Sequence, residues 1–199
     1  MTRTDRRLLI APMAIFGLGG VALLLLFLMP HNEGPFYDNL LPELIGFCIE
    51  GFFLVGLLTL IQESRERGRR KELWQSLRGA LRGMLSNLDI AMLPPNAEPT
   101  ATARLERDVS MVPRFMREMQ LVQIELPCML ALKQESIETL SLVRDLVPVA
   151  AQLSAGHMRW WIAIVDSMRQ ISTTRTREEF EQHTYRLLEN IQEFDRLGY

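Results

Sequence analysis

Hydrophobic residues are spread unevenly along this chain, and their pattern divides it into two parts. Residues 8–29 form an apolar run of 22 residues without a charged side chain. As a helix this run would be about 33 Å long, enough to cross a hydrocarbon core of about 30 Å. A second apolar run follows at residues 41–61. The pattern predicts a transmembrane helical hairpin within residues 1–62, followed by a charged, amphipathic domain at residues 63–199.

The charges that flank the two apolar runs predict their orientation. Three arginines precede the first run, whereas the short connection between the runs contains no Lys or Arg. Five basic residues follow the second run: Arg65, Arg67, Arg69, Arg70 and Lys71. By the positive-inside rule both termini are expected in the cytoplasm, with a bacterial inner membrane as the location. The basic cluster is expected to contact anionic lipid headgroups.

The second helix is expected to continue beyond the membrane, because one apolar stripe follows it. The stripe recurs at steps of four, four, three and four residues, which is the spacing of a single helical face. Its members are Leu73, Leu77, Leu81, Met84 and Leu88. Gly68 is expected to weaken or bend this helix, and the Pro94-Pro95 pair to end it.

Four more helices are predicted in the rest of the chain. Their approximate ranges are residues 102–126, 128–153 and 157–171, with a last helix that starts at Thr176. Thr176 and Glu179 have the spacing of a capping box. No segment alternates with period two. The sequence therefore predicts an all-α protein, in which a transmembrane hairpin is followed by a cytoplasmic antiparallel helical bundle.

Prolines and one glycine mark the expected helix ends. Pro113 should kink or split the helix at 102–126, because proline lacks a backbone N–H and clashes with the preceding turn. Pro127 suits the first turn of the next helix, and Pro148 is expected to perturb its end. Gly156 is expected to open the helix at 157–171.

Glu50 is the principal candidate for function in the membrane part. It lies near the middle of the second apolar run, where an ionisable side chain costs roughly 2.5–3.5 kcal/mol on insertion scales. Glu43 lies seven residues earlier on the same helical face, in a first turn where the helix dipole favours an acid. Two aligned acids suit a cation path or a proton-binding site shared by several copies. The alternative is a protonated Glu50 that hydrogen-bonds across a helix interface.

Glycines in both apolar runs predict close approach of membrane helices. They are Gly17, Gly19 and Gly20 in the first run, and Gly46, Gly51 and Gly56 in the second. Packing within one hairpin and assembly between copies are both compatible with this pattern.

One pair of residues resembles a catalytic motif. Arg177 precedes His183 by six positions near the start of the last predicted helix. This Arg-x5-His spacing resembles the motif of HEPN-type ribonucleases, which are also helical bundles, and the resemblance covers only these two residues and the fold class. It implies RNA cleavage with Arg177 and His183 as catalytic residues. The alternative is a surface histidine and an arginine near a helix start.

Charge and composition narrow the remaining functional classes. Residues 62–199 contain 19 basic and 19 acidic side chains, so no nucleic-acid partner is expected. No His or Cys pair has metal spacing, and no glycine-rich phosphate loop follows a strand, so neither a metal nor a cofactor is expected. Cys48 and Cys128 lie in different parts of the chain and should not pair. His157 and Trp161 are expected to be buried in the bundle.

Three functional hypotheses follow from these patterns. The leading one is a homo-oligomeric inner-membrane protein that acts as a channel-like or membrane-disrupting effector, gated through its cytoplasmic helices; bacterial antiviral defence is one role that would fit. The second is a non-conducting, membrane-anchored adaptor that binds a cytoplasmic protein partner. The third is the HEPN-like ribonuclease; the first two hypotheses are not enzymes.

Overall fold

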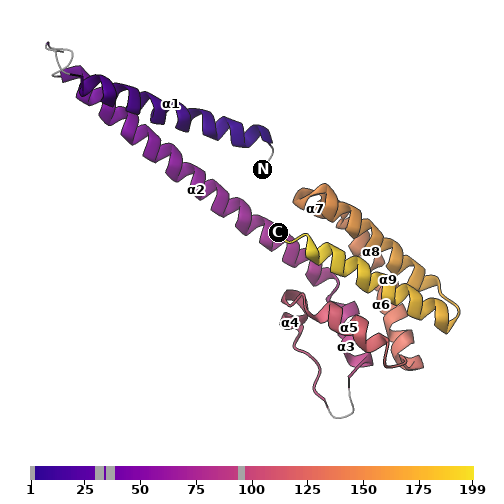
Figure 1. Cartoon of the computed structure of the whole chain (residues 1–199). Coiled ribbons are helices and arrows are strands. Elements are labelled where there is room, and N and C mark those ends of the chain that lie inside the picture. Colours follow the sequence, from indigo (N-terminus) through magenta and orange to yellow (C-terminus); the bar gives the residue numbers. More distant parts are fainter. Residues whose placement is uncertain (1–2, 30–33, 35–38, 94–96) are drawn as a thin grey trace. The chain divides into compact units, whose positions relative to one another are not determined.

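The computed structural model describes residues 3–29, 34, 39–93 and 97–199, with side chains from Ala11 onward. Within these residues every regular element is a helix: nine helices are present and no strand (Figure 1). The all-α prediction is confirmed. The chain divides into two compact units, Met1–Arg67 and Gly68–Tyr199.

In the first unit, two apolar helices pack side by side (Figure 1). Helix α1 covers Arg3–Phe27, and helix α2 covers Leu41–Ala80, so that α2 also continues into the second unit. Glycines allow the close approach: a Cβ added to Gly51 would lie 2.6 Å from the ring of Phe16, and one added to Gly20 would lie 3.3 Å from Cβ of Cys48. Phe16 and Phe47 make an edge-to-face contact with ring centroids 5.8 Å apart.

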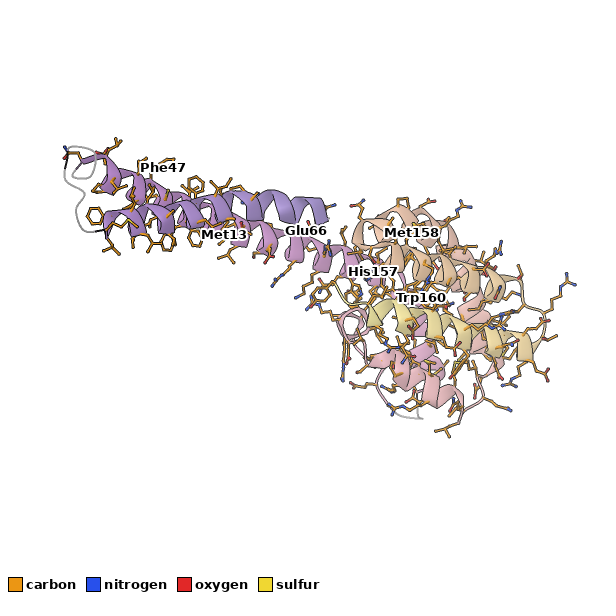
Figure 2. All side chains as sticks on the ribbon, turned by 45° about the horizontal axis from the view of Figure 1, so that its top comes forward. Met13, Phe47, Glu66, His157, Met158 and Trp160 are labelled. Atoms are coloured by element: carbon orange, nitrogen blue, oxygen red, sulfur yellow. The ribbon has the colours of Figure 1, made fainter. Side chains whose placement is uncertain are left out.

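Most large apolar side chains of this unit point outward. Figure 2 shows them projecting along both helices, with Met13 labelled on α1 and Phe47 on α2. Phe53 is 70% exposed, and the most apolar 18-residue window of α2 has a mean hydropathy of 2.3 with none of its residues buried. Monomeric soluble proteins rarely expose apolar patches of this extent.

The second unit is a bundle built around three long helices. Its helices after α2 are α3 (Arg82–Ala91), α4 (Thr102–Arg107), α5 (Met111–Met119), α6 (Leu126–Asp145), α7 (Val147–Leu153), α8 (Ala155–Thr173) and α9 (Arg177–Arg196). Lys133 near the start of α6 donates to the carbonyl of Thr174 after α8, and Trp161 near the start of α8 donates to the carbonyl of Val143 near the end of α6. These contacts make α6 and α8 antiparallel.

Helices α8 and α9 are also antiparallel. The amide of Asn190 on α9 donates to the carbonyl of Ala163 and the hydroxyl of Ser167 on α8, while His157 at the start of α8 contacts Phe194 near the end of α9. A continuous core joins these helices to α3 and α5. The predicted apolar stripe beyond the second span lies in this core: Leu77, Leu81, Met84 and Leu88 are buried, and Leu73 packs against it.

The second helix was predicted to run unbroken to Pro94. This continuity is wrong, because α2 ends at Ala80 and α3 begins at Arg82. Leu81 at the break donates to the carbonyl of Arg78, a tighter pattern than the α-helical one. Gly79 and Gly83 flank the break, and glycine weakens a helix interior. Residues 94–96, where the end was predicted, lie outside the described residues.

The helix predicted at 102–126 is split into two short helices, α4 and α5, but the break comes before Pro113 and α5 ends at Met119. Asp108 between them is extended, and its carboxylate accepts hydrogen bonds from the N–H and hydroxyl of Ser110. The break comes before Pro113, which therefore lies in the first turn of α5. An unbroken helix would have driven the Pro113 ring against the carbonyl of Val109.

The predicted helix 128–153 is divided at Leu146 into α6 and α7, because Pro148 cannot donate the hydrogen bond that would continue the helix. The next helix opens at Ser154 rather than at Gly156. The Ser154 hydroxyl accepts the N–H of His157, which is the bond of an N-cap. The Thr176 cap is confirmed by its bond from the N–H of Glu179, whereas the Glu179 carboxylate accepts the N–H of Arg175.

Candidate functional site

Glu50 lies on the face of α2 opposite α1. Cys48 marks the α1 side, because it lies 3.3 Å from a Cβ built on Gly20. Glu50 follows Cys48 by two residues, which is about 200° around a helix. Its side chain is exposed, and the structure gives it no hydrogen bond or ion pair to another described residue. This carboxyl group is therefore directed away from the hairpin that carries it.

The surroundings of Glu50 on this outer face include a second acid and a small residue. Glu43 is exposed and lies about 20° from Glu50 around α2. Gly46 lies one turn before Glu50, and no atom lies within 4 Å of a Cβ built there. Another helix could approach this face closely at Gly46.

A separate apolar hollow of about 410 Å³ lies between α1 and α2. It is lined by Phe16, Gly17, Gly20, Val21, Leu24, Leu25, Ile45, Cys48, Ile49, Phe52 and Phe53. Glu50 is absent from this lining, so the hollow and the acidic face are different surfaces of the same hairpin.

The predicted basic cluster lies on α2 after its apolar stretch. Arg65, Arg67, Arg69 and Lys71 are exposed, and Arg70 is half-buried. Arg67 pairs with Glu63 at 3.3 Å, and Arg69 donates to the side chain of Gln152 at 2.9 Å. These residues offer positive charge next to the apolar segment, which is the chemistry that anionic headgroups bind.

Sequence analysis did not identify the buried ion pair between Arg78 and Asp195. The Arg78 side chain is 0% exposed, the Asp195 side chain is 6% exposed, and Nη1 lies 2.5 Å from Oδ2. Burial lowers the pKa of Arg78, and burial raises the pKa of Asp195 to about 7 against the opposing attraction of Arg78. The apolar stripe gave no signal of it, because Arg78 lies about 100° around the helix from Leu77, beside the predicted stripe and not within it.

The two residues of the ribonuclease-like motif have separate surroundings. Arg177 pairs with Glu181 at 3.0 Å and donates to the carbonyl of Ile124 at 2.5 Å. Nδ1 of His183 is buried without a hydrogen-bond partner among the described residues. No hydrogen bond joins Arg177 to His183 in the described part of the chain. The arginine thus holds the segment before α6 in place.

His157 and Trp161 are buried as predicted. His157 hydrogen-bonds through Nδ1 to the Ser154 hydroxyl and through Nε2 to the carbonyl of Gly198, so its ring is fully satisfied. Burial lowers the pKa of His157 most, with a smaller contribution from the charge of Arg70. Across the described residues, no group of three or more His, Cys, Asp or Glu side chains has metal-binding geometry.

One described helix, α2, is long and apolar enough to cross a membrane, while the apolar part of α1 with described side chains, Ala11–Phe27, is shorter. No protein family model, curated protein or solved structure matches the chain.

Proposed function

We propose that the chain inserts the α1–α2 hairpin into a bilayer and assembles there as a homo-oligomer, with Glu50 facing an interior shared by several copies. One observation carries this proposal: Glu50 lies in an apolar helix, on the face opposite α1, without a partner among the residues that the structure describes. The basic residues that follow the apolar stretch of α2 favour an inner bacterial membrane with both termini on the cytoplasmic side.

Assembly would remove Glu50 from contact with lipid. An ionisable group near the middle of a bilayer costs roughly 2.5–3.5 kcal/mol on insertion scales, and such groups normally face other helices or water. Gly46 on the same face permits close approach of a neighbouring helix. Helix α1 cannot cover Glu50, because α1 packs on the opposite side of α2.

Several copies around an axis would create a channel-like path. Glu43 and Glu50 are seven residues apart, or about 10 Å along a helix, so each would contribute a ring of carboxyl groups. Rings of acidic side chains are one way in which channels select cations. The bundle formed by residues 68–199 would then regulate conduction from the cytoplasmic side.

The test is cation flux from liposomes that contain the full-length protein. We expect Glu50→Gln to abolish flux, because it removes the charge from the shared interior while keeping the size of the side chain. Glu72→Gln is the matched control, since Glu72 is an exposed acid on α2 outside the apolar stretch. Equal flux from wild-type protein and Glu50→Gln would refute the pore-lining role.

A membrane-anchored adaptor is a second candidate, which exposed apolar side chains on the bundle favour. Leu121 is 84% exposed, and Leu126 and Leu130 are exposed at successive turns of α6. A protein partner that covered these residues would bury apolar area. Replacing residues 1–62 with an unrelated membrane hairpin would preserve function in an adaptor and eliminate it in a channel.

A further inference from the structure

The buried pair of Arg78 and Asp195 joins three elements of the bundle. Arg78 lies in the last turn of α2 and Asp195 in the last turn of α9. Nη2 of Arg78 also donates to the carbonyls of Leu105 and Asp108 at the end of α4, at 3.3 and 3.2 Å. One guanidinium group thus fixes the C-terminal end of α2 to both α4 and α9.

The pair is incompletely satisfied for a buried pair of charges. A single N–H···O bond joins the two side chains, although arginine and a carboxylate can form two. Nε of Arg78 and Oδ1 of Asp195 are buried and have no hydrogen-bond partner among the described residues. Desolvation of two charges can exceed their attraction when such bonds are missing. The ionised pair is therefore a weak point in the core of the bundle.

Water has a route to this pair. A hollow of about 330 Å³ lies beside Asp195, and its lining residues are Val109, Pro113, Gln192, Glu193, Asp195 and Arg196. A proton leaving the carboxyl group can therefore pass to solvent without unfolding of α6 or α8, whose contacts with each other lie elsewhere in the bundle.

We infer that Arg78 and Asp195 form a proton-sensitive latch on the C-terminal end of α2, which is closed while Asp195 is protonated and is loosened when Asp195 ionises. The neutral carboxyl group keeps an oxygen that accepts from Arg78, and the α4 carbonyls continue to hold the guanidinium. The ionised carboxylate adds a second buried charge that hydration in an open state would relieve.

The sign of the pH dependence follows from linkage. The pKa of Asp195 is about 7 in the closed state, and its ordinary value in an open, hydrated state is 3.8. Opening between these values releases one proton, so the closed latch loses stability as pH rises and reaches a constant level above about 7.

Charged groups on the elements packed around this pair also contribute to the pH dependence. They are Arg78 on α2, Arg104 and Asp108 at α4, Arg114 and Glu118 on α5, His157 on α8, and Glu193 and Arg196 on α9. The hydroxyl of Ser110 lowers the pKa of Asp108, so Asp108 titrates further from neutral pH. His157 has a lowered pKa and therefore opposes Asp195 in sign.

Hydrogen exchange measured by mass spectrometry on the full-length protein in detergent tests this inference. Amides in the last turns of α2 are followed at pH 5.5, 6.5, 7.5 and 8.5, after correction for intrinsic exchange. We expect the opening equilibrium to rise about tenfold from pH 5.5 to 6.5 and to change little from 7.5 to 8.5, because opening releases one proton. A profile without this rise would overturn the latch.

Two variants and a control make the test specific. Asp195→Asn should remove the rise, because asparagine cannot ionise but can still accept from Arg78. Arg78→Met should move the plateau to higher pH, because it removes the attraction that favours the ionised carboxylate. If Asp195→Asn does not fold, this second variant tests the latch in its place. Arg82→Gln breaks the exposed Arg82–Glu106 pair nearby and should keep the wild-type profile. A rise retained in Asp195→Asn, an unmoved plateau in Arg78→Met, or a flat control would contradict the inference.

The consequence for the membrane part rests on the proposed channel function. If the channel exists, flux in the wild-type protein should change between pH 5.5 and 6.5, and flux in Asp195→Asn should not. Exchange that follows the expected profile without any flux would retain the latch and reject the channel. Flux that depends on Glu50, together with a flat exchange profile, would retain the channel and reject the latch.

Discussion

Helix α2 contributes to two units, and these units differ in the exposure of their apolar side chains. In the first unit Phe53 is 70% exposed, and in the second Trp161 is 0% exposed with its indole N–H bonded to the carbonyl of Val143. Burial in the second unit is what the hydrophobic effect produces in water. The outward arrangement of the first is stable in hydrocarbon, where apolar surface needs no cover.

The polar groups differ in the same way between the two units. In the bundle, two part-buried polar side chains have partners in their own chain: Lys133 donates to the carbonyl of Thr174, and the amide of Asn190 joins α9 to α8. In the hairpin, Glu50 has no such neighbour within the described residues. These polar groups of the bundle are therefore paired within one chain, whereas the hairpin leaves Glu50 without a partner among the described residues. Insertion in lipid beside another copy, as proposed above, would account for this difference.

Truncating one aromatic side chain in each unit would test this difference most strongly. Trp161→Ala should lower the free energy of unfolding by about 3–5 kcal/mol, because it leaves a core cavity and an unpaired carbonyl. Phe53→Ala should change it little, because the ring does not pack inside the monomer. Denaturant unfolding of both variants in detergent provides the measurement. Comparable losses in the two variants would contradict the division into two environments.

Two glycines would sharpen the comparison within the hairpin. Gly51→Ala would place Cβ 2.6 Å from the Phe16 ring, so the ring or the helices must shift, at a cost of about 1–3 kcal/mol. Gly46→Ala meets no atom of the described residues within 4 Å and should leave the isolated hairpin unchanged. Thermal unfolding of each variant at low protein concentration checks this. If Gly46→Ala instead lowers oligomer mass in light scattering, the Glu50 face is an interface between copies.

The smallest effect expected is a pH dependence confined to the bundle. The pKa of His157 is lowered first by burial, so the unfolded chain takes up a proton more readily than the folded one. Stability should therefore fall as pH decreases below about 6.5, the ordinary pKa of histidine. Unfolding midpoints at pH 7.5 and 5.5 should differ less in His157→Gln than in the parent. Because Asp195 acts with the opposite sign, both proteins should carry Asp195→Asn.

The sequence was sufficient for the features that depend on local spacing. It predicted the all-α class, the apolar stripe from Leu73 to Leu88, the Thr176 cap, and the burial of His157 and Trp161. Helix ends were harder, because breaks at Leu81, Asp108 and Leu146 depend on tertiary contacts as well as on glycine and proline. The placement of Glu50 opposite α1 required knowledge of which glycines form the seam.

The Arg78–Asp195 pair shows why some sites are beyond prediction from one sequence. These residues are 117 positions apart, and no periodicity connects them. Arg78 lies beside the apolar stripe, and residues 62–199 contain 19 acidic side chains that could be its partner. Only the packing of α9 against the end of α2 selects Asp195.

The free thiols of Cys48 and Cys128 are two sites in the native chain to which spectroscopic labels can be attached. Cys48 lies half-buried in the seam between α1 and α2, and Cys128 is half-buried at the start of α6, against the core of the bundle. Neither forms a disulfide. Maleimide dyes of different membrane permeability can therefore report separately on opening of the hairpin and of the bundle, and single-molecule traces can be recorded without introducing a foreign cysteine.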